Sequence, residues 1–189
     1  MGEITRSWPF ENEEGRSSFT LTIREPPLSG DSLGLKTWGS SYVLAQLLPH
    51  FATTSLSRPL SSTKSLGLPI LELGSGTGLL GLAAACMWRT PVILTDLPTI
   101  VPNLSHNVEL NRSTVEALGG DVEAGALTWG GSKEESDPRF LKLNEFKVNT
   151  HRIARFGDRL TFLFRSYLLQ TPFTMMTIRV FLLALSTAS

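Results

Sequence analysis

The chain has 189 residues, which is the length of one domain or of one domain with an extension. Its 17 basic residues balance its 17 acidic residues, so it lacks the basic excess that drives binding to nucleic-acid phosphates, and we expect no nucleic-acid partner. The single cysteine excludes an intramolecular disulfide and a cysteine-rich zinc site. No apolar run is long enough to span a membrane, and the acidic N-terminus lacks the apolar segment of a secretory signal, so we expect no membrane partner.

The N-terminal third predicts a strand, a helix and a loop. Residues 18–24 alternate apolar and polar side chains, which is typical of a half-buried strand. A serine at position 40 or 41 can cap a helix that continues to about His50. Residues 52–65 are rich in serine and threonine and predict a surface loop.

The middle of the chain predicts alternating strands and helices. This order indicates parallel strands joined by right-handed crossovers, a Rossmann-like α/β fold that binds its ligand at the carboxyl ends of the strands. The predicted strands are 69–73, 92–95 and 121–129, and the predicted helices are 79–88 and 99–111.

A glycine-rich turn follows the first of these strands. Its glycines allow a ligand to approach the backbone N–H groups at the start of the next helix. Asp96 ends the following strand, 18 residues after Gly78, where its carboxylate can accept hydrogen bonds from ribose hydroxyls. The two features predict a nucleoside-containing cofactor; a glycine-rich turn without a ligand is the alternative. The turn consists of Gly74, Ser75, Gly76, Thr77 and Gly78.

Two further residues distinguish between cofactors. The dinucleotide fingerprint requires glycine at the position of Leu79. Glu72 lies in an apolar strand, where a buried anion is costly unless it is paired. The amino group of S-adenosyl-L-methionine would supply that pairing, whereas a pyrophosphate would be repelled. The pattern therefore favours S-adenosyl-L-methionine, with a nucleotide-dependent oxidoreductase as the less favoured alternative.

Four ordered motifs within residues 34–131 carry a family resemblance. They resemble the seven-strand class I S-adenosylmethionine-dependent methyltransferases, and among these the protein-lysine methyltransferase group with its fungal members. The motifs are LELGSGTGLLGLAAA at 71–85, GLKTWGSSYVLA at 34–45, Thr95-Asp96 followed by Asn103, Asn107 and Asn111, and the strand exit formed by Leu127, Trp129 and Gly130.

The resemblance implies roles for several residues. The glycine turn would cradle the methionine part of the cofactor and Asp96 would hold the ribose. Trp129 would flank the adenine and Trp38 would close the site, although ordinary core packing is the alternative for both tryptophans. The three asparagines could contact ligand or simply cap and solvate one face of a helix. No metal is implied, since the three histidines are scattered, and no catalytic residue is identified.

The resemblance also implies a substrate: a lysine of a cytosolic protein, with a translation elongation factor as the leading candidate. We expect a monomer in the cytoplasm, with the nucleus as a second compartment. The lysine must lose its proton before it can attack the methyl group, and desolvation or nearby carboxylates commonly assist that step.

The C-terminal part departs from the family pattern. The family's acidic D-P-x-Y segment is missing, because Asp137 and Pro138 are not followed by tyrosine. Residues 148–189 hold five arginines, no lysine and one acid, Asp158. We therefore expect a C-terminally truncated or altered member, with a catalytically impaired protein that only binds cofactor or a partner as the alternative function.

This expectation divides the chain into three parts. Residues 1–33 form an extension with a short strand, 34–131 a Rossmann-like core that binds the cofactor, and 132–189 a divergent tail. Three strands alone leave apolar surface uncovered. Either residues 150–189 fold as surrogate helices and strands, with 153–170 as an amphipathic helix or strand, or the domain is unstable.

Overall fold

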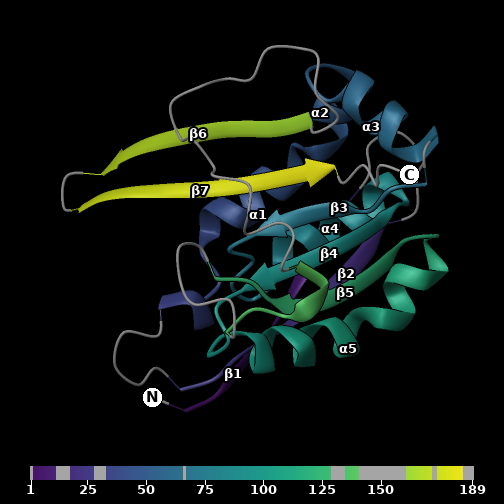
Figure 1. The fold of residues 1–189 in the computed structure, drawn as a ribbon. Helices are drawn as coiled ribbons and strands as arrows, with labels where there is room; N and C mark the ends of the chain where they lie inside the picture. Colours follow the sequence, from purple (N-terminus) through teal and green to yellow (C-terminus); the bar gives the residue numbers. More distant parts are fainter. Residues whose placement is uncertain are drawn as a thin grey trace.

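The computed structural model describes residues 2–11, 18–27, 33–65, 67–128 and 135–140, without the side chains of Pro59 and Arg139, and the backbone of two C-terminal strands. Its centre is a parallel sheet whose strands alternate with helices, as predicted (Figure 1). The strands are β3 (Ile70–Leu73), β4 (Pro91–Asp96) and β5 (Asp121–Ala126), and the helices are α4 (Leu79–Trp88) and α5 (Val101–Ala117).

Helix α4 is almost entirely buried, because its alanines and leucines carry no polar side chain and allow close packing on the sheet. The main core cluster joins α4 to α5 and to alternate residues of the strands. A smaller cluster of Leu71, Leu73, Leu127 and Phe140 is separate from it. Successive strand residues point to opposite faces, so this division puts Ile70 and Glu72 on the α4 side of β3.

Two antiparallel strands extend the sheet beyond β3. β6 (Thr161–Thr171) pairs with β7 (Thr174–Ala184), and β7 pairs antiparallel with β3, giving the order β5-β4-β3-β7-β6. The sequence left two alternatives for residues 150–189, surrogate helices and strands or an unstable domain, and the backbone of these two ranges forms strands. In the part of the chain that the structure describes, the neighbour of β3 on this side is antiparallel, so the sheet is mixed.

The N-terminal extension forms a hairpin rather than one strand. β2 (Phe19–Glu25) matches the predicted strand, and β1 (Ile4–Phe10) pairs with it antiparallel in a separate two-stranded sheet. The sequence did not predict β1, because Arg6 and Pro9 interrupt its apolar alternation. The hairpin lies beside α5 (Figure 1).

The predicted loop at 52–65 is wrong. After η1 (Leu33–Leu35), the chain forms α1 (Gly39–Gln46), α2 (Leu48–Thr53) and α3 (Ser57–Ser65). In α3 the hydroxyls of Ser61 and Ser65 donate to carbonyls four residues earlier, so the serines bond within the helix, and buried Leu60 anchors it.

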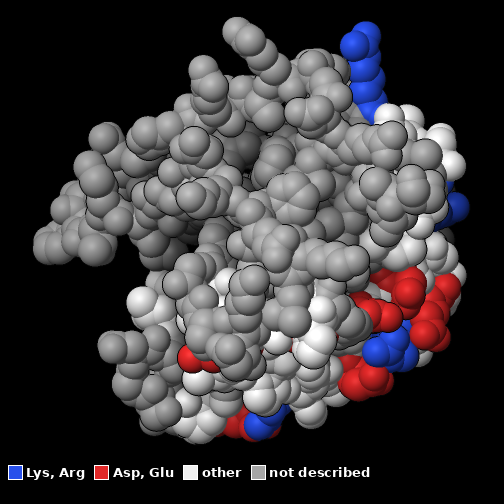
Figure 2. All heavy atoms as spheres, in the orientation of Figure 1, with Lys and Arg blue, Asp and Glu red and all other residues white. Residues whose placement is uncertain are grey.

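The outer edge strand β5 carries acidic side chains. Asp121 and Glu123 are exposed, and Figure 2 shows acidic side chains gathered where α5 and β5 reach the surface, with basic ones among them. Charge on an edge strand opposes pairing with a second chain. Among the described residues, no helix has the length and apolar character required to cross a membrane.

Candidate functional site

The glycine turn and Asp96 lie in direct contact. The backbone N–H of Gly76 donates to Asp96 Oδ2 at 2.7 Å, and those of Gly74 and Ser75 donate to the Thr95 carbonyl at 2.8 and 3.0 Å. The exit of β5 joins them, because Leu127 N donates to the Asp96 carbonyl at 2.9 Å. The carboxyl ends of three strands therefore meet at one place, where α/β sheets bind their ligands.

Glycine is required in this turn for two reasons. Gly74, Gly76 and Gly78 have φ values of 71°, 58° and 89°, a region that other residues rarely adopt. At Gly78 a Cβ atom would also lie 2.7 Å from a methyl carbon of Leu104, so this glycine sets the distance between α4 and α5. Among the described residues, nothing lies within 4 Å of a Cβ placed at Gly74, so none of them covers this side of the turn.

Both carboxylate oxygens of Asp96 accept hydrogen bonds from backbone N–H groups. Oδ1 accepts from Leu97 N at 2.7 Å, while Oδ2 accepts from Gly76 N. Burial raises the pKa of Asp96, and these two hydrogen bonds counteract the rise. Each oxygen retains a second lone pair, so the carboxylate can also accept from a ribose hydroxyl.

Glu72 is buried, and among the residues that the structure describes its Oε2 has no hydrogen-bond partner. This oxygen packs against Gly81 in α4, where a Cβ would overlap it. Burial is the main reason that the pKa of Glu72 is raised to about 8; the negative charge of Asp96 adds to the rise, while hydrogen bonding from the Ser75 side chain and the Gly81 backbone opposes it. A ligand ammonium would supply a partner for Oε2, so a buried carboxyl with one unpartnered oxygen beside the turn fits S-adenosyl-L-methionine and not a pyrophosphate.

The side chains of Ser75 and Thr77 hold the turn from within. Ser75 Oγ accepts from Thr95 N at 3.1 Å, which joins the turn to β4. Thr77 is buried, its hydroxyl pairs with that of Thr37 at 2.9 Å, and its carbonyl accepts from Asn107 Nδ2 at 2.9 Å. Contact of Ser75 and Thr77 with a ligand stays a prediction. Because both side chains bond within the protein, we expect the backbone of the turn to make any such contact.

The three asparagines of α5 do not solvate a helix face, because all three are buried. Asn111 Oδ1 accepts from Thr22 N and its Nδ2 donates to Thr22 O, both at 2.8 Å, and Asn107 makes the same pair with Arg24 at 2.9 and 3.1 Å. Four residues of a helix rise about 6 Å, and two residues of a strand rise about 6.6 Å. The spacing of the two asparagines along α5 therefore matches the spacing of their partners along β2. The four-residue spacing of the asparagines, which puts them on one face of α5, was the sequence signal that could have indicated this contact with β2.

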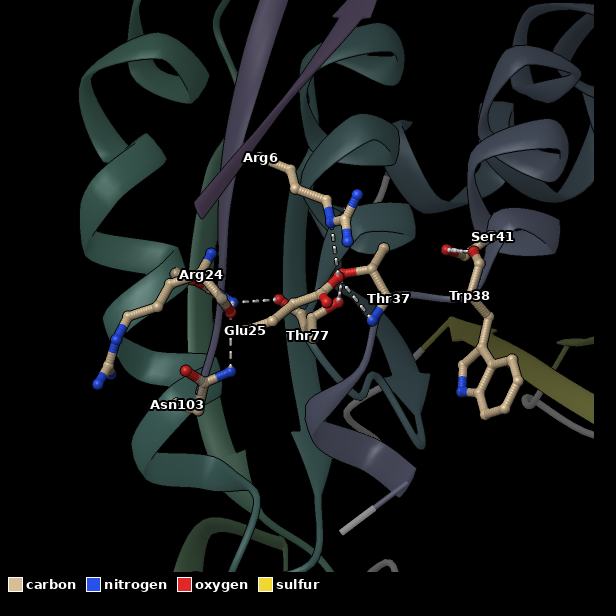
Figure 3. Close-up of polar contacts among 9 residues, drawn as sticks. Arg6, Arg24, Glu25, Thr37, Trp38, Ser41, Thr77 and Asn103 are labelled. Atoms are coloured by element: carbon tan, nitrogen blue, oxygen red, sulfur yellow. Dashed lines mark hydrogen bonds and ion pairs between the residues drawn. The ribbon is translucent and has the colours of Figure 1, made fainter. Parts of the chain in front are cut away.

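The structure describes one of the two tryptophans that were predicted to contact the cofactor. Trp38 is half-buried and precedes α1, where Ser41 Oγ donates to its carbonyl at 2.7 Å. Figure 3 shows its indole ring turned away from the group formed by Glu25, Thr37 and Thr77. Its closure over a cofactor stays a prediction. Trp129 lies outside the described residues.

Comparison with known proteins agrees with the geometry. Residues 16–143 match a family model described as lysine methyltransferase. Protein-lysine N-methyltransferase EFM2 of Saccharomyces cerevisiae is 39% identical over 142 residues, covering 69% of this chain and 32% of that protein. Protein-lysine N-methyltransferase rrg1 of Schizosaccharomyces pombe is 33% identical over 172 residues, covering 87% and 51%.

A shorter match is to EEF1A lysine methyltransferase 3 of Mus musculus, 38% identical over 64 residues, covering 34% of this chain and 25% of that protein. The chain thus spans about a third of EFM2 and about half of rrg1. The family match covers more than half of the chain and includes every motif from β2 to the exit of β5. The chain belongs to the lysine methyltransferase family.

Proposed function

We propose that the protein transfers a methyl group from S-adenosyl-L-methionine to the side-chain amine of a lysine in a protein substrate. The observation that carries the proposal is the 2.7 Å contact between Gly76 N and Asp96 Oδ2, which joins the glycine turn to the acid at the end of β4. Class I methyltransferases use this cofactor in general, and the unpaired Glu72 beside the turn supports the same choice.

Each residue has a proposed part in binding. The outer backbone of Gly74–Gly76 faces the methionine part, Asp96 accepts from the ribose hydroxyls, and Glu72 pairs with the amino group. When bound, the cofactor supplies an electrophilic methyl group on a sulfonium. The protein's contribution is then to orient the lysine amine in line with that carbon and to exclude water.

The first test is calorimetry with S-adenosylhomocysteine and, separately, NADH. We expect S-adenosylhomocysteine to bind and NADH to give no heat; the reverse result overturns the choice of cofactor. Asp96→Asn places an N–H against a backbone N–H and should weaken binding about tenfold or more. Glu116→Gln, on an exposed part of α5, is the matched control and should bind as the natural protein does.

The substrate is proposed from the relatives. One is named for EEF1A, which fits the expected translation elongation factor, so purified EEF1A is the first substrate to test. Incubation with tritiated S-adenosyl-L-methionine should label a lysine, located by peptide mass spectrometry. We also propose, from the resemblance of the sequence motifs, a monomer in the cytoplasm with the nucleus as a second compartment. Imaging of a tagged chain tests the compartment, and light scattering tests the monomer.

A second candidate function has an observation in its favour. Asp137 precedes η3 (Pro138–Phe140), and Phe140 stands where the family's D-P-x-Y segment has tyrosine, so that segment is missing at this place. The chain would then bind the cofactor without transferring its methyl group. Binding of S-adenosylhomocysteine with no label on EEF1A or on any fungal lysate protein would support this candidate against the enzyme.

A further inference from the structure

The N-terminal hairpin lies outside the proposed cofactor site, yet a continuous set of polar contacts connects it to the glycine turn. Figure 3 shows Arg6, Glu25, Thr37 and Thr77 pointing toward one another. Glu25 ends β2 and Thr77 lies in the turn, 52 positions later in the chain. Both ends of this connection are buried, so their hydrogen bonds are protected from competition by water.

The first connection runs through Thr37. Glu25 Oε1 accepts from Thr37 N at 3.1 Å, with Arg6 Nε at 3.9 Å from the same oxygen. The Thr37 hydroxyl then pairs with the Thr77 hydroxyl at 2.9 Å. A buried carboxylate thereby fixes the segment that precedes α1, and that segment fixes Thr77.

The second connection runs through Asn107. Its Nδ2 donates to Thr77 O at 2.9 Å and to Arg24 O at 3.1 Å, and its Oδ1 accepts from Arg24 N at 2.9 Å. Both amide hydrogens are therefore used, one on the turn and one on β2. A single fully buried side chain holds the hairpin and the turn at once.

The turn needs such support. Thr77 stands between Gly76 and Gly78, both in the left-handed region, and glycine loses more conformational entropy on ordering than any other residue. We propose that the β1–β2 hairpin positions the cofactor turn: Glu25 through Thr37, and Asn107 directly, are positioning residues that hold Thr77. What the turn binds rests on the proposed function, whereas its order can be measured without ligand.

Two matched pairs of variants test this in the full chain. Asn107→Ala and Asn111→Ala remove equally buried amides and equivalent bonds to β2, but only the former loses a bond to the turn. Thr37→Val removes the hydroxyl and keeps the shape, and Thr37→Ser restores the hydroxyl. The Thr37 pair decides the question if either asparagine variant fails to fold.

The main measurement is amide hydrogen exchange in the ligand-free protein. We expect faster exchange of the Gly76 and Gly78 amides in Asn107→Ala and Thr37→Val, relative to β4 amides, and no such change in Asn111→Ala or Thr37→Ser. S-adenosylhomocysteine affinity should fall about fivefold in the first two only. Equal exchange in both members of each pair overturns the inference. Failure of the natural protein to bind S-adenosylhomocysteine overturns the proposed function instead and leaves the exchange comparison valid.

Discussion

Helix α4 and strand β2 are both buried, but they are held by different kinds of contact. Helix α4 packs mainly through apolar contact, with Ala83, Ala84 and Ala85 fully buried, and Trp88 Nε1 adds a hydrogen bond to the Leu48 carbonyl at 3.1 Å. Strand β2 buries Leu21 and Ile23 and adds the paired asparagine bonds to its backbone. Apolar contact is non-directional, whereas each amide pair fixes one strand residue. A one-residue slip of β2 would break both pairs, so the hairpin has one register and a defined distance to the turn.

The largest expected effect concerns Glu72, a carboxyl buried against α4. Folding raises the pKa of Glu72 from 4.5 to about 8, so the folded protein retains a proton that the unfolded chain loses. Its contribution therefore opposes folding increasingly as the pH rises from about 4.5 to 8 and is fully unfavourable above 8. Glu72→Gln should remove a penalty on the order of 5 kcal/mol at pH 9.

Thermal unfolding between pH 5 and 9 measures this effect. The natural protein should lose stability across that range more steeply than Glu72→Gln, and the two should converge at pH 5. Parallel pH profiles would show that Glu72 is paired or solvated in the folded protein. S-adenosylhomocysteine should stabilise the natural protein more than the variant, because only a carboxylate pairs with the ligand ammonium.

The next effect tests how tightly the apolar layer is packed. A Cβ on Gly81 would overlap Leu94 and Glu72, so Gly81→Ala should cost about 3 kcal/mol of unfolding free energy. Gly39→Ala is the matched control, since a Cβ there meets nothing within 4 Å and Gly39 begins α1. Denaturant unfolding compares the two. Equal midpoints would mean that α4 can move from the sheet without loss.

The asparagine hydrogen bonds between α5 and the β1–β2 hairpin should contribute less to the free energy of unfolding than the packing of α4 at Gly81. Asn111→Ala leaves the N–H and carbonyl of Thr22 without their side-chain partner, at a cost of about 2 kcal/mol. Asn111→Asp should cost at least as much, because it buries a carboxylate and places one of its oxygens against the Thr22 and Asn107 carbonyls, to which the amide donates. Denaturant unfolding again supplies the measurement, and a change in the alanine variant no larger than in Gly39→Ala would show that water replaces the amide.

The same contrast explains what the sequence could predict. Strands β3 and β4, helix α4 and the site at Gly76 and Asp96 follow from local patterns, because apolar runs, glycines and a strand-ending acid each act on near neighbours. The role of Asn107 and Asn111 could not be predicted in this way. Their partners lie 83 and 89 positions away, and an asparagine on a helix shows the same pattern whether it faces water or a strand.

The smallest effect is expected on the outer surface of α5. Arg112 bonds Glu109 at 2.8 Å and lies 4.0 Å from Glu116, and all three side chains are at least a third exposed. The bond to Glu109 raises the pKa of Arg112, which stays charged at every relevant pH. Exposed pairs of this kind contribute little, because water and salt screen them. Arg112→Ala should shift the melting temperature by less than about 2 °C, and 0.5 M salt should abolish the difference. A larger, salt-resistant loss would instead come from the 3.4 Å bond of Arg112 to the Val122 carbonyl, and would make this side chain a polar link between α5 and β5.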